Sequence, residues 1–249
     1  MKSEHVLIGC GEVGRAVKKF IEETKQVLVI EKTTDISTYQ KVRPIYMHVT
    51  IPYNDDFTRT VITYKQFFKP KYIIIYSTVI PGTTKYIGSN AVHSPIEGRH
   101  PNLYDSFKTF TRFVSGKKAK EVAKYFMGKG LDVKIFDKAE TTELAKLFST
   151  TRYGLNLVFT QLEQDICDEL NLNFNDVVLN YQLMYNNGYK RLGLEKFQQP
   201  LLTSPDNCIK GHCVVKNSEL LYEVNQHELI KQLKDFNKRS ENENKDKDI

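Results

Sequence analysis

The sequence has no long apolar run and little cysteine. No stretch approaches the roughly 18 consecutive apolar residues of a membrane-spanning helix, and the start MKSEH leads straight into a strand pattern rather than a signal peptide. The four cysteines, at positions 10, 167, 208 and 213, form no paired spacing, which favours reduced thiols over a disulfide framework. We therefore expect a cytoplasmic protein without a membrane segment.

Clustered charge and metal-ligand spacings are also scarce. The formal net charge is +6 over 249 residues, and the Lys and Arg residues are scattered rather than interleaved with aromatic side chains, so a nucleic-acid partner is disfavoured. His212 lies beside Cys208 and Cys213, but no second paired set accompanies them, and we expect no metal. The sequence contains no internal repeat. Its length allows one α/β domain and a smaller second domain, and a core of that size needs no disulfides.

An apolar run near the N-terminus, VLIGCGEVG, is interrupted by three glycines. Gly9, Gly11 and Gly14 have the spacing in which the first glycine permits a turn, the second lets the backbone approach a pyrophosphate, and the third allows close helix packing. The backbone N–H groups of Glu12 and Val13, at the start of the following helix, would then hold the anion. A purely structural turn is the alternative.

A second apolar run, at positions 27–30, ends in Glu31. This residue follows Gly11 by about 20 positions, the place where an acidic side chain meets the ribose hydroxyls of NAD. Lys32 leaves NADP open, because a cation there could bind a 2′-phosphate. NAD is the predicted cofactor.

Strand and helix patterns alternate up to about residue 137, which predicts a doubly wound parallel sheet and a Rossmann NAD-binding domain over residues 1–137. The expected strands are at 6–8, 27–30, 45–50, 72–76, 91–95, 111–114 and 133–136, and the expected helices are at 15–24, 57–68 and 117–127.

Two hydroxyl residues, Ser77 and Thr78, follow the strand predicted at 72–76. Ligands of open parallel sheets bind at the carboxyl ends of the strands, so these hydroxyls would lie at the rim of the same crevice as the glycine turn. Thr78 could contact a substrate or water. Alternatively, both residues cap the next turn.

From residue 138 the pattern becomes helical. Apolar residues spaced three and four apart predict one long helix over 139–170, roughly 45 Å in length, and a helix of that length favours packing on a second subunit. We expect a helical dimerisation segment over 138–238, with a second helix at 175–189 ending at Asn187–Gly188, and a charged, disordered tail over 239–249.

Few polar residues of the helical segment stand out on their own. Lys146 and Thr150 lie four apart, so they share one helix face, although a helical lysine is more often simply solvated. Cys213 follows a glycine in a predicted loop, where a thiol could be reactive. A lone cysteine is more often a small buried residue.

The order of these segments resembles the nucleotide-sugar dehydrogenases, the family of UDP-glucose 6-dehydrogenase and UDP-N-acetylmannosamine dehydrogenase, over residues 5 to about 221. The glycine turn with Glu31 is similar to the family's NAD site, and HVTIP, which contains Thr50 and Pro52, is similar to its strand ending in a valine-proline turn. The other matching segments are STVIPGTT at 77–84, SPIE at 94–97, ELAKL at 143–147, which opens the dimer helix, and GHC at 211–213.

This resemblance implies that a sugar's primary alcohol is oxidised twice to a carboxylate. Cys213 would attack the aldehyde from the first hydride transfer, the second transfer would leave a thioester, and water would hydrolyse it. Lys146 would stabilise the oxyanion. Thr78 and Glu97 would position water or relay protons.

Three departures from the family pattern bear on this chemistry. Thr150 stands where the family has an asparagine, and Asn217 stands where it has an aspartate, and an amide cannot act as a general base. No segment corresponds to the family's C-terminal nucleotide-binding domain. We expect a shortened, homodimeric NAD-dependent oxidoreductase that acts on a phosphorylated or nucleotide-linked sugar. The alternatives are a one-step dehydrogenase for a smaller hydroxy compound that uses Lys146, and a non-catalytic NAD-binding protein.

Overall fold

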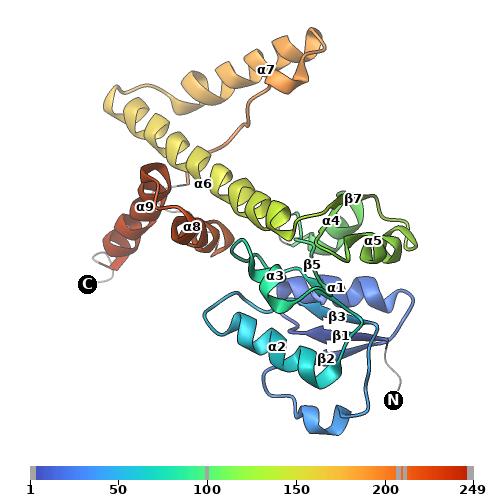
Figure 1. The fold of residues 1–249 in the computed structure, drawn as a ribbon. Helices are drawn as coiled ribbons and strands as arrows, with labels where there is room; N and C mark the ends of the chain where they lie inside the picture. Colours follow the sequence, from blue (N-terminus) through green and yellow to red (C-terminus); the bar gives the residue numbers. More distant parts are fainter. Residues whose placement is uncertain (1–3, 99–100, 206–208, 210–211, 246–249) are drawn as a thin grey trace. The chain divides into compact units, whose positions relative to one another are not determined.

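The chain divides into two compact units, Met1–Lys146 and Leu147–Ile249. The computed structural model describes residues 4–98, 101–205, 209 and 212–245 (Figure 1). The boundary lies inside helix α6 (Ala139–Glu169) rather than at the predicted position after residue 137. The first turns of α6 belong to the N-terminal unit because Glu143 and Lys146 form hydrogen bonds with its loops.

The N-terminal unit is built on a seven-stranded sheet with the order β2-β1-β3-β4-β5-β6-β7. Strands β1 to β5 pair in parallel, β6 runs antiparallel to β5, and β7 is parallel to β6. The predicted doubly wound sheet is confirmed, with its last two strands reversed. The strands are β1 (His5–Ile8), β2 (Val27–Ile30), β3 (Tyr46–Val49), β4 (Tyr72–Ile75), β5 (Ala91–His93), β6 (Arg112–Ser115) and β7 (Val133–Phe136).

Helices cover both faces of this sheet because the buried strands are apolar on both sides. Leu7 and Ile74 belong to one apolar cluster, which includes residues of α1, α4 and α5, while Ile8 and Ile75 belong to a second cluster with residues of α2 and α3. The helices are α1 (Glu12–Glu22), the 3-10 helix η1 (Ile36–Tyr39), α2 (Phe57–Phe68), α3 (Thr83–Ile87), α4 (Leu103–Thr109) and α5 (Ala119–Met127). The short helices α3 and α4 were not expected from the sequence, because neither is long enough to show a helical period.

The second unit is helical. Besides the remainder of α6, it contains the π-helix η2 (Asn175–Asn180), α7 (Tyr181–Arg191), the 3-10 helix η3 (Glu195–Phe197), α8 (His212–Val224) and α9 (Glu228–Lys245). Gly154 allows close packing on α6, since a Cβ there would lie 2.5 Å from Val214 and 2.9 Å from Leu233. The predicted long helix is confirmed to within one residue.

Three details of the helical segment differ from the prediction. The helix predicted at 175–189 begins with a π-helix and continues through Gly188 to Arg191. Cys213 lies in the first turn of α8 rather than in a loop. The tail predicted as disordered from 239 is helical to Lys245, because charged and amide residues without proline or glycine extend an existing helix at little cost.

Some predicted features lie outside the described residues: Cys208, Gly211 and the last four positions, 246–249. Within the described part of the chain, no helix is long and apolar enough to cross a membrane.

Candidate functional site

The glycine turn connects β1 to α1 and is held closed by its neighbours. Gly9 has φ +85° and donates its N–H to Ile30 O at 2.9 Å. A Cβ on Gly14 would lie 2.5 Å from Gly9 O, whereas a Cβ on Gly11 would meet no atom within 4 Å. The first and third glycines are therefore required by packing. Gly11 leaves open space beside the start of α1, and the backbone N–H groups at the start of a helix can bind an anion.

This turn lies where the strand order reverses, because β1 has β2 on one side and β3 on the other. Glu31 directly follows β2, whose last residue pairs with the last residue of β1. Its backbone N–H donates to Thr34 Oγ1 at 2.9 Å, and both Glu31 and Lys32 are exposed. The turn and an exposed carboxylate thus end adjacent strands at the crevice where open α/β sheets bind ligands.

Two predicted cofactor-binding hydroxyls are bonded within the protein. Thr50 Oγ1 donates to Gly9 O at 2.8 Å, and Ser77 Oγ donates to Ile51 O at 2.6 Å. Both hydroxyls join the carboxyl ends of neighbouring strands. Pro52 is exposed after β3, and Thr78 is half-buried before α3.

Lys146 and Glu97 meet at the end of β5. Lys146 Nζ donates to Ile96 O at 2.6 Å and lies 3.2 Å from Glu97 Oε2, with side-chain exposures of 12% and 24%. A cation held by a carbonyl and a carboxylate at a partly open position can bind a substrate oxygen and exchange protons.

One turn earlier on α6, Glu143 is fully buried and bonded to the segment after β4. Its Oε2 accepts from the N–H of Gly82 at 2.7 Å, and its Oε1 accepts from the N–H of Thr84 at 2.8 Å. Burial raises the pKa of this carboxyl, while the two hydrogen bonds oppose the shift. Glu143 is the first residue of the ELAKL segment, so its two hydrogen bonds connect that segment to STVIPGTT at 77–84.

A buried histidine forms a second connection between α6 and the sheet. His93 Nε2 lies 3.2 Å from Ser77 O, which can only accept, so Nε2 carries the proton. The Thr142 hydroxyl must then donate to Nδ1, at 2.7 Å, and the Ser115 hydroxyl donates to Thr142 at 2.5 Å. Burial lowers the pKa of His93 to about 3, which keeps the ring neutral and preserves this direction.

Two further buried histidines, His5 and His48, form a pair within the sheet. His5 Nδ1 is 3.0 Å from His48 Nε2, and His48 Nδ1 is 2.9 Å from Tyr76 Oη. Burial lowers the pKa of His5 to about 4 and that of His48 well below its ordinary value. Both rings are neutral at physiological pH.

In the second unit, the structure brings Asn217 and Thr150 together. Asn217 Nδ2 donates to Thr150 Oγ1 at 3.1 Å, and Asn217 is buried. Cys213, one turn earlier on α8, is a free and exposed cysteine. The two residues that depart from the family pattern are thus bonded to each other.

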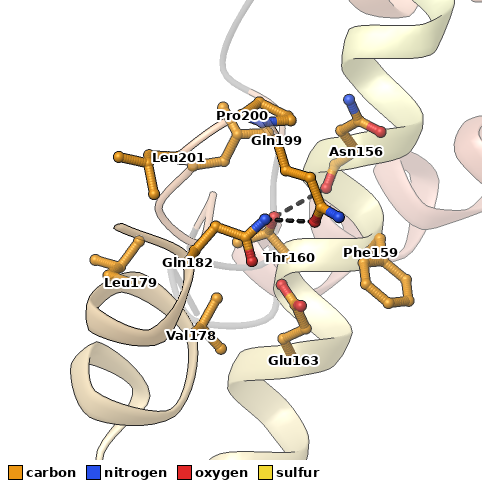
Figure 2. A pocket seen from close by; sticks show the side chains of 11 residues that line it. Asn156, Phe159, Thr160, Glu163, Val178, Leu179, Gln182, Gln199, Pro200 and Leu201 are labelled. Atoms are coloured by element: carbon orange, nitrogen blue, oxygen red, sulfur yellow. Dashed lines mark hydrogen bonds between the residues drawn. The ribbon is translucent and has the colours of Figure 1, made fainter. Parts of the chain in front are cut away.

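The second unit also has a groove of about 280 Å³ between α6, η2, α7 and residues 199–202, which the sequence did not predict (Figure 2). Three amides and six apolar or proline side chains line it together with Thr160 and Glu163. Burial raises the pKa of the Glu163 carboxyl. Figure 2 shows Gln182 hydrogen-bonded to Gln199 across one side of the groove.

The sequence gives no site role to four buried polar residues behind the predicted site: His93, Arg112, Thr142 and Glu143, of which only Glu143 lies in a segment matched by the resemblance. An arginine inside a strand pattern was the one visible signal, because strands buried on both faces seldom carry a charge. Within the described residues, no group of three or more His, Cys, Asp or Glu side chains could hold a metal ion.

Comparison with known proteins finds similar structures only. No protein-family model and no curated protein matches the chain. The UDP-D-ManNAc dehydrogenase from Pyrococcus horikoshii has a TM-score of 0.74 at 16% identity, covering 96% of this chain and 68% of that one. The UDP-N-acetyl-mannosamine dehydrogenase from Staphylococcus aureus has a TM-score of 0.69 at 18% identity, with coverages of 96% and 68%.

A 3-hydroxyisobutyrate dehydrogenase from Mycobacterium tuberculosis also has a TM-score of 0.69, at 12% identity, covering 94% of this chain and 92% of that one. These similarities show that the chain shares the fold of these proteins, a Rossmann unit followed in the sequence by a helical unit.

Proposed function

We propose that this chain is an NAD-dependent dehydrogenase that oxidises the primary alcohol of a nucleotide-linked sugar. The observation that carries the proposal is the glycine turn, with open space at Gly11 beside the start of α1 and Glu31 at the end of the adjacent strand. The similarity over 96% of the chain to two structures named as UDP-N-acetylmannosamine dehydrogenases supports this substrate class.

NAD, when bound, accepts a hydride from the alcohol carbon. Lys146 would donate a hydrogen bond to the alcohol oxygen and stabilise its negative charge as the hydroxyl proton leaves. Glu97, whose carboxylate lies 3.2 Å from Lys146 Nζ, would accept that proton or pass it to water. The product of this step is an aldehyde.

Cys213 would carry the second oxidation. Its thiolate would add to the aldehyde carbon and give a thiohemiacetal, and loss of a second hydride from that carbon would give a thioester. Water would then release the carboxylate and restore the thiol. This scheme consumes two NAD per substrate, and the exposed position of Cys213 supports it.

The contact between Asn217 and Thr150 favours a second candidate function. It places an amide beside a hydroxyl, and neither group can act as a general base to activate water for thioester hydrolysis. The second candidate is a one-step alcohol dehydrogenase in which Lys146 acts and Cys213 does not.

NADH formation with UDP-N-acetylmannosamine and UDP-glucose tests both schemes, in the unaltered chain and in Cys213→Ala, with Cys167→Ala as the control at a buried cysteine. Two NADH per substrate, lost in Cys213→Ala alone, supports the thioester scheme. One NADH, unchanged in Cys213→Ala, supports the one-step scheme. Calorimetric binding of NAD without turnover on either nucleotide sugar would overturn the thioester scheme, and inactivity on smaller hydroxy compounds as well would overturn both.

We also propose that the active form is a homodimer that packs through the second half of α6. Phe159, Leu162, Ile166 and Leu170 form one helical stripe and are 45–63% exposed, an apolar surface that a second copy would cover. Phe159→Asp should convert the dimer to a monomer in analytical ultracentrifugation. Phe110→Asp, at an equally exposed phenylalanine of the N-terminal unit, should leave the dimer intact, and a monomeric parent chain would refute the proposal.

A cytoplasmic location completes the proposal. The three described cysteines, Cys10, Cys167 and Cys213, are all free thiols, and free thiols are typical of a reducing compartment.

A further inference from the structure

Arg112 is a fully buried cation behind the loop that follows β5. Its Nη2 lies 2.9 Å from Ser94 O, 3.0 Å from Ser94 Oγ and 2.8 Å from Pro95 O. The guanidinium lies over the Phe107 ring, 4.3 Å from its centroid. Among the described residues, none pairs with Nε or Nη1. A buried charge without a carboxylate partner is costly, so it calls for an explanation beyond packing.

The reversed direction of β6 explains how this arginine reaches the site. Because β6 runs antiparallel to β5, its first residue, Arg112, lies beside the carboxyl end of β5. That end of the sheet is where the glycine turn and the other site segments lie. If β6 ran parallel to β5, its first residue would lie at the opposite end of the sheet, where the parallel strands begin.

The loop 94–98 is fixed at both of its ends. Ser94 continues the ladder of β4 by donating its N–H to Ile75 O at 2.8 Å. Gly98, at φ +121°, packs so closely on α4 that a Cβ would lie 2.3 Å from the Ser106 Cβ. Between these ends, Arg112 is the donor that the structure gives to the carbonyls of Ser94 and Pro95.

The next two residues of this loop, Ile96 and Glu97, both contact Lys146. Ile96 O accepts from Lys146 Nζ at 2.6 Å, and the Glu97 carboxylate lies 3.2 Å away. One peptide unit therefore separates the carbonyl bound by Arg112 from the carbonyl bound by Lys146. A movement of Pro95 O would displace Ile96 O.

We propose that Arg112 is a positioning residue that fixes the loop 94–98 so that Ile96 O and Glu97 hold the Lys146 ammonium in place. Without the guanidinium, two buried carbonyls would lose their donor and the loop would turn them toward water. The proposal deepens the proposed function and rests on it only for the role of Lys146 toward substrate.

Competitive acetylation with trace acetic anhydride tests the proposal, because it reports the reactivity and the pH profile of individual lysines and needs neither substrate nor cofactor. In Arg112→Met, Lys146 acetylation should rise about tenfold relative to that of exposed Lys85. This is the effect expected when the loop 94–98 loses the free energy of one charge-assisted hydrogen bond from Arg112. Arg112→Lys, which restores the cation, should reverse part of this rise.

Phe68→Leu is the matched control, since Phe68 is equally buried but belongs to the opposite face of the sheet. Denaturant is added to the parent chain until its folded fraction equals that of each variant, so that global unfolding is separated from loop movement. An equal rise in Phe68→Leu, or an unchanged Lys146 acetylation in Arg112→Met, would overturn the proposal.

If Arg112→Met does not fold, Ser94→Ala provides the same test with a smaller change, because it removes only the Oγ contact at 3.0 Å. It should raise Lys146 acetylation by about twofold to threefold, and no rise would overturn the proposal. A positive acetylation result together with absent dehydrogenase turnover would refute the proposed function while leaving the positioning role of Arg112 intact.

Discussion

The Lys146 ammonium lies 3.2 Å from the Glu97 carboxylate, although the two residues are 49 positions apart. Glu97 belongs to the loop after β5, and Lys146 belongs to the second turn of α6. This ion pair is mostly shielded from water, so the Coulomb attraction between its two charges is stronger than in an exposed pair. Through it, the start of α6 is joined to the loop at the carboxyl end of the sheet.

Lys146→Met should lower kcat by about a hundredfold or more, the usual effect of removing a general acid–base or oxyanion-stabilising group. Lys65→Met is the matched control, because Lys65 Nζ also donates to a backbone carbonyl, Ile87 O, at 2.7 Å but lies outside the proposed site. Steady-state rates of NADH formation measure the effect. Equal losses of activity in the two variants would exclude a specific role for Lys146.

The second and third glycines of the turn, Gly11 and Gly14, allow a paired test. Gly14→Ala should destabilise the N-terminal unit by about 1–3 kcal/mol, because the new Cβ would lie 2.5 Å from Gly9 O. Gly11→Ala should cost less, about 1 kcal/mol or below, since Gly11 is the N-cap of α1, where alanine is less favourable than glycine, but no atom lies within 4 Å of its added Cβ. It should nevertheless weaken NAD binding about tenfold or more, because the methyl group occupies the space of the pyrophosphate.

Chemical denaturation and calorimetry distinguish the two glycine effects. If Gly11→Ala binds NAD as tightly as the parent chain, the pyrophosphate does not lie over Gly11.

Three buried histidines predict a pH-dependent stability. The pKa is about 4 for His5, about 3 for His93, and well below the ordinary 6.5 for His48. These values are depressed in the folded state, so the unfolded chain binds protons that the folded chain does not. The stability contribution is complete above about pH 6.5 and is lost as the pH falls from 6.5 toward 4, by about 1.4 kcal/mol per pH unit for each histidine.

Denaturant unfolding at a series of pH values in this window measures the slope. His93→Gln should reduce the slope by about a third, because one of three proton-binding differences is removed. An unaltered slope in His93→Gln would contradict the assignment, and His5→Gln serves the same purpose if His93→Gln does not fold.

The architecture was largely predictable because strong periodic signals determine it. The seven strand patterns, the glycine turn and the three-and-four spacing of α6 each involve many residues of one type. The reversal of β6 was not predictable, since an apolar strand such as FVS reads the same in either direction and the connection through α4 decides it. The tail is helical to Lys245 because it continues α9, which begins at Glu228. Composition alone does not reveal such a continuation.

Site residues could be predicted only where they lie in a recognisable sequence motif. Lys146 and Glu97 were found through the resemblance, and the structure places them in contact. The structural roles of His93 and Arg112 depend on partners at distant positions of the chain, such as Thr142 and Ser94. A single sequence shows the residue types but not the pairing that makes their burial tolerable.

Asn217→Asp tests whether the bonded amide limits the second half of the reaction. The substituted carboxylate would face the Thr150 hydroxyl, now bonded to Asn217 at 3.1 Å, and that hydroxyl can rotate to donate. A carboxylate there can activate water for hydrolysis of the thioester, so we expect the carboxylate product, which is released after the second NADH has formed, to appear at least about tenfold faster than in the parent chain. Asn217→Ala is the control, because it removes the amide without adding a base. Equal rates of carboxylate release in the two variants, measured by product mass in single-turnover samples, would show that hydrolysis does not depend on this position.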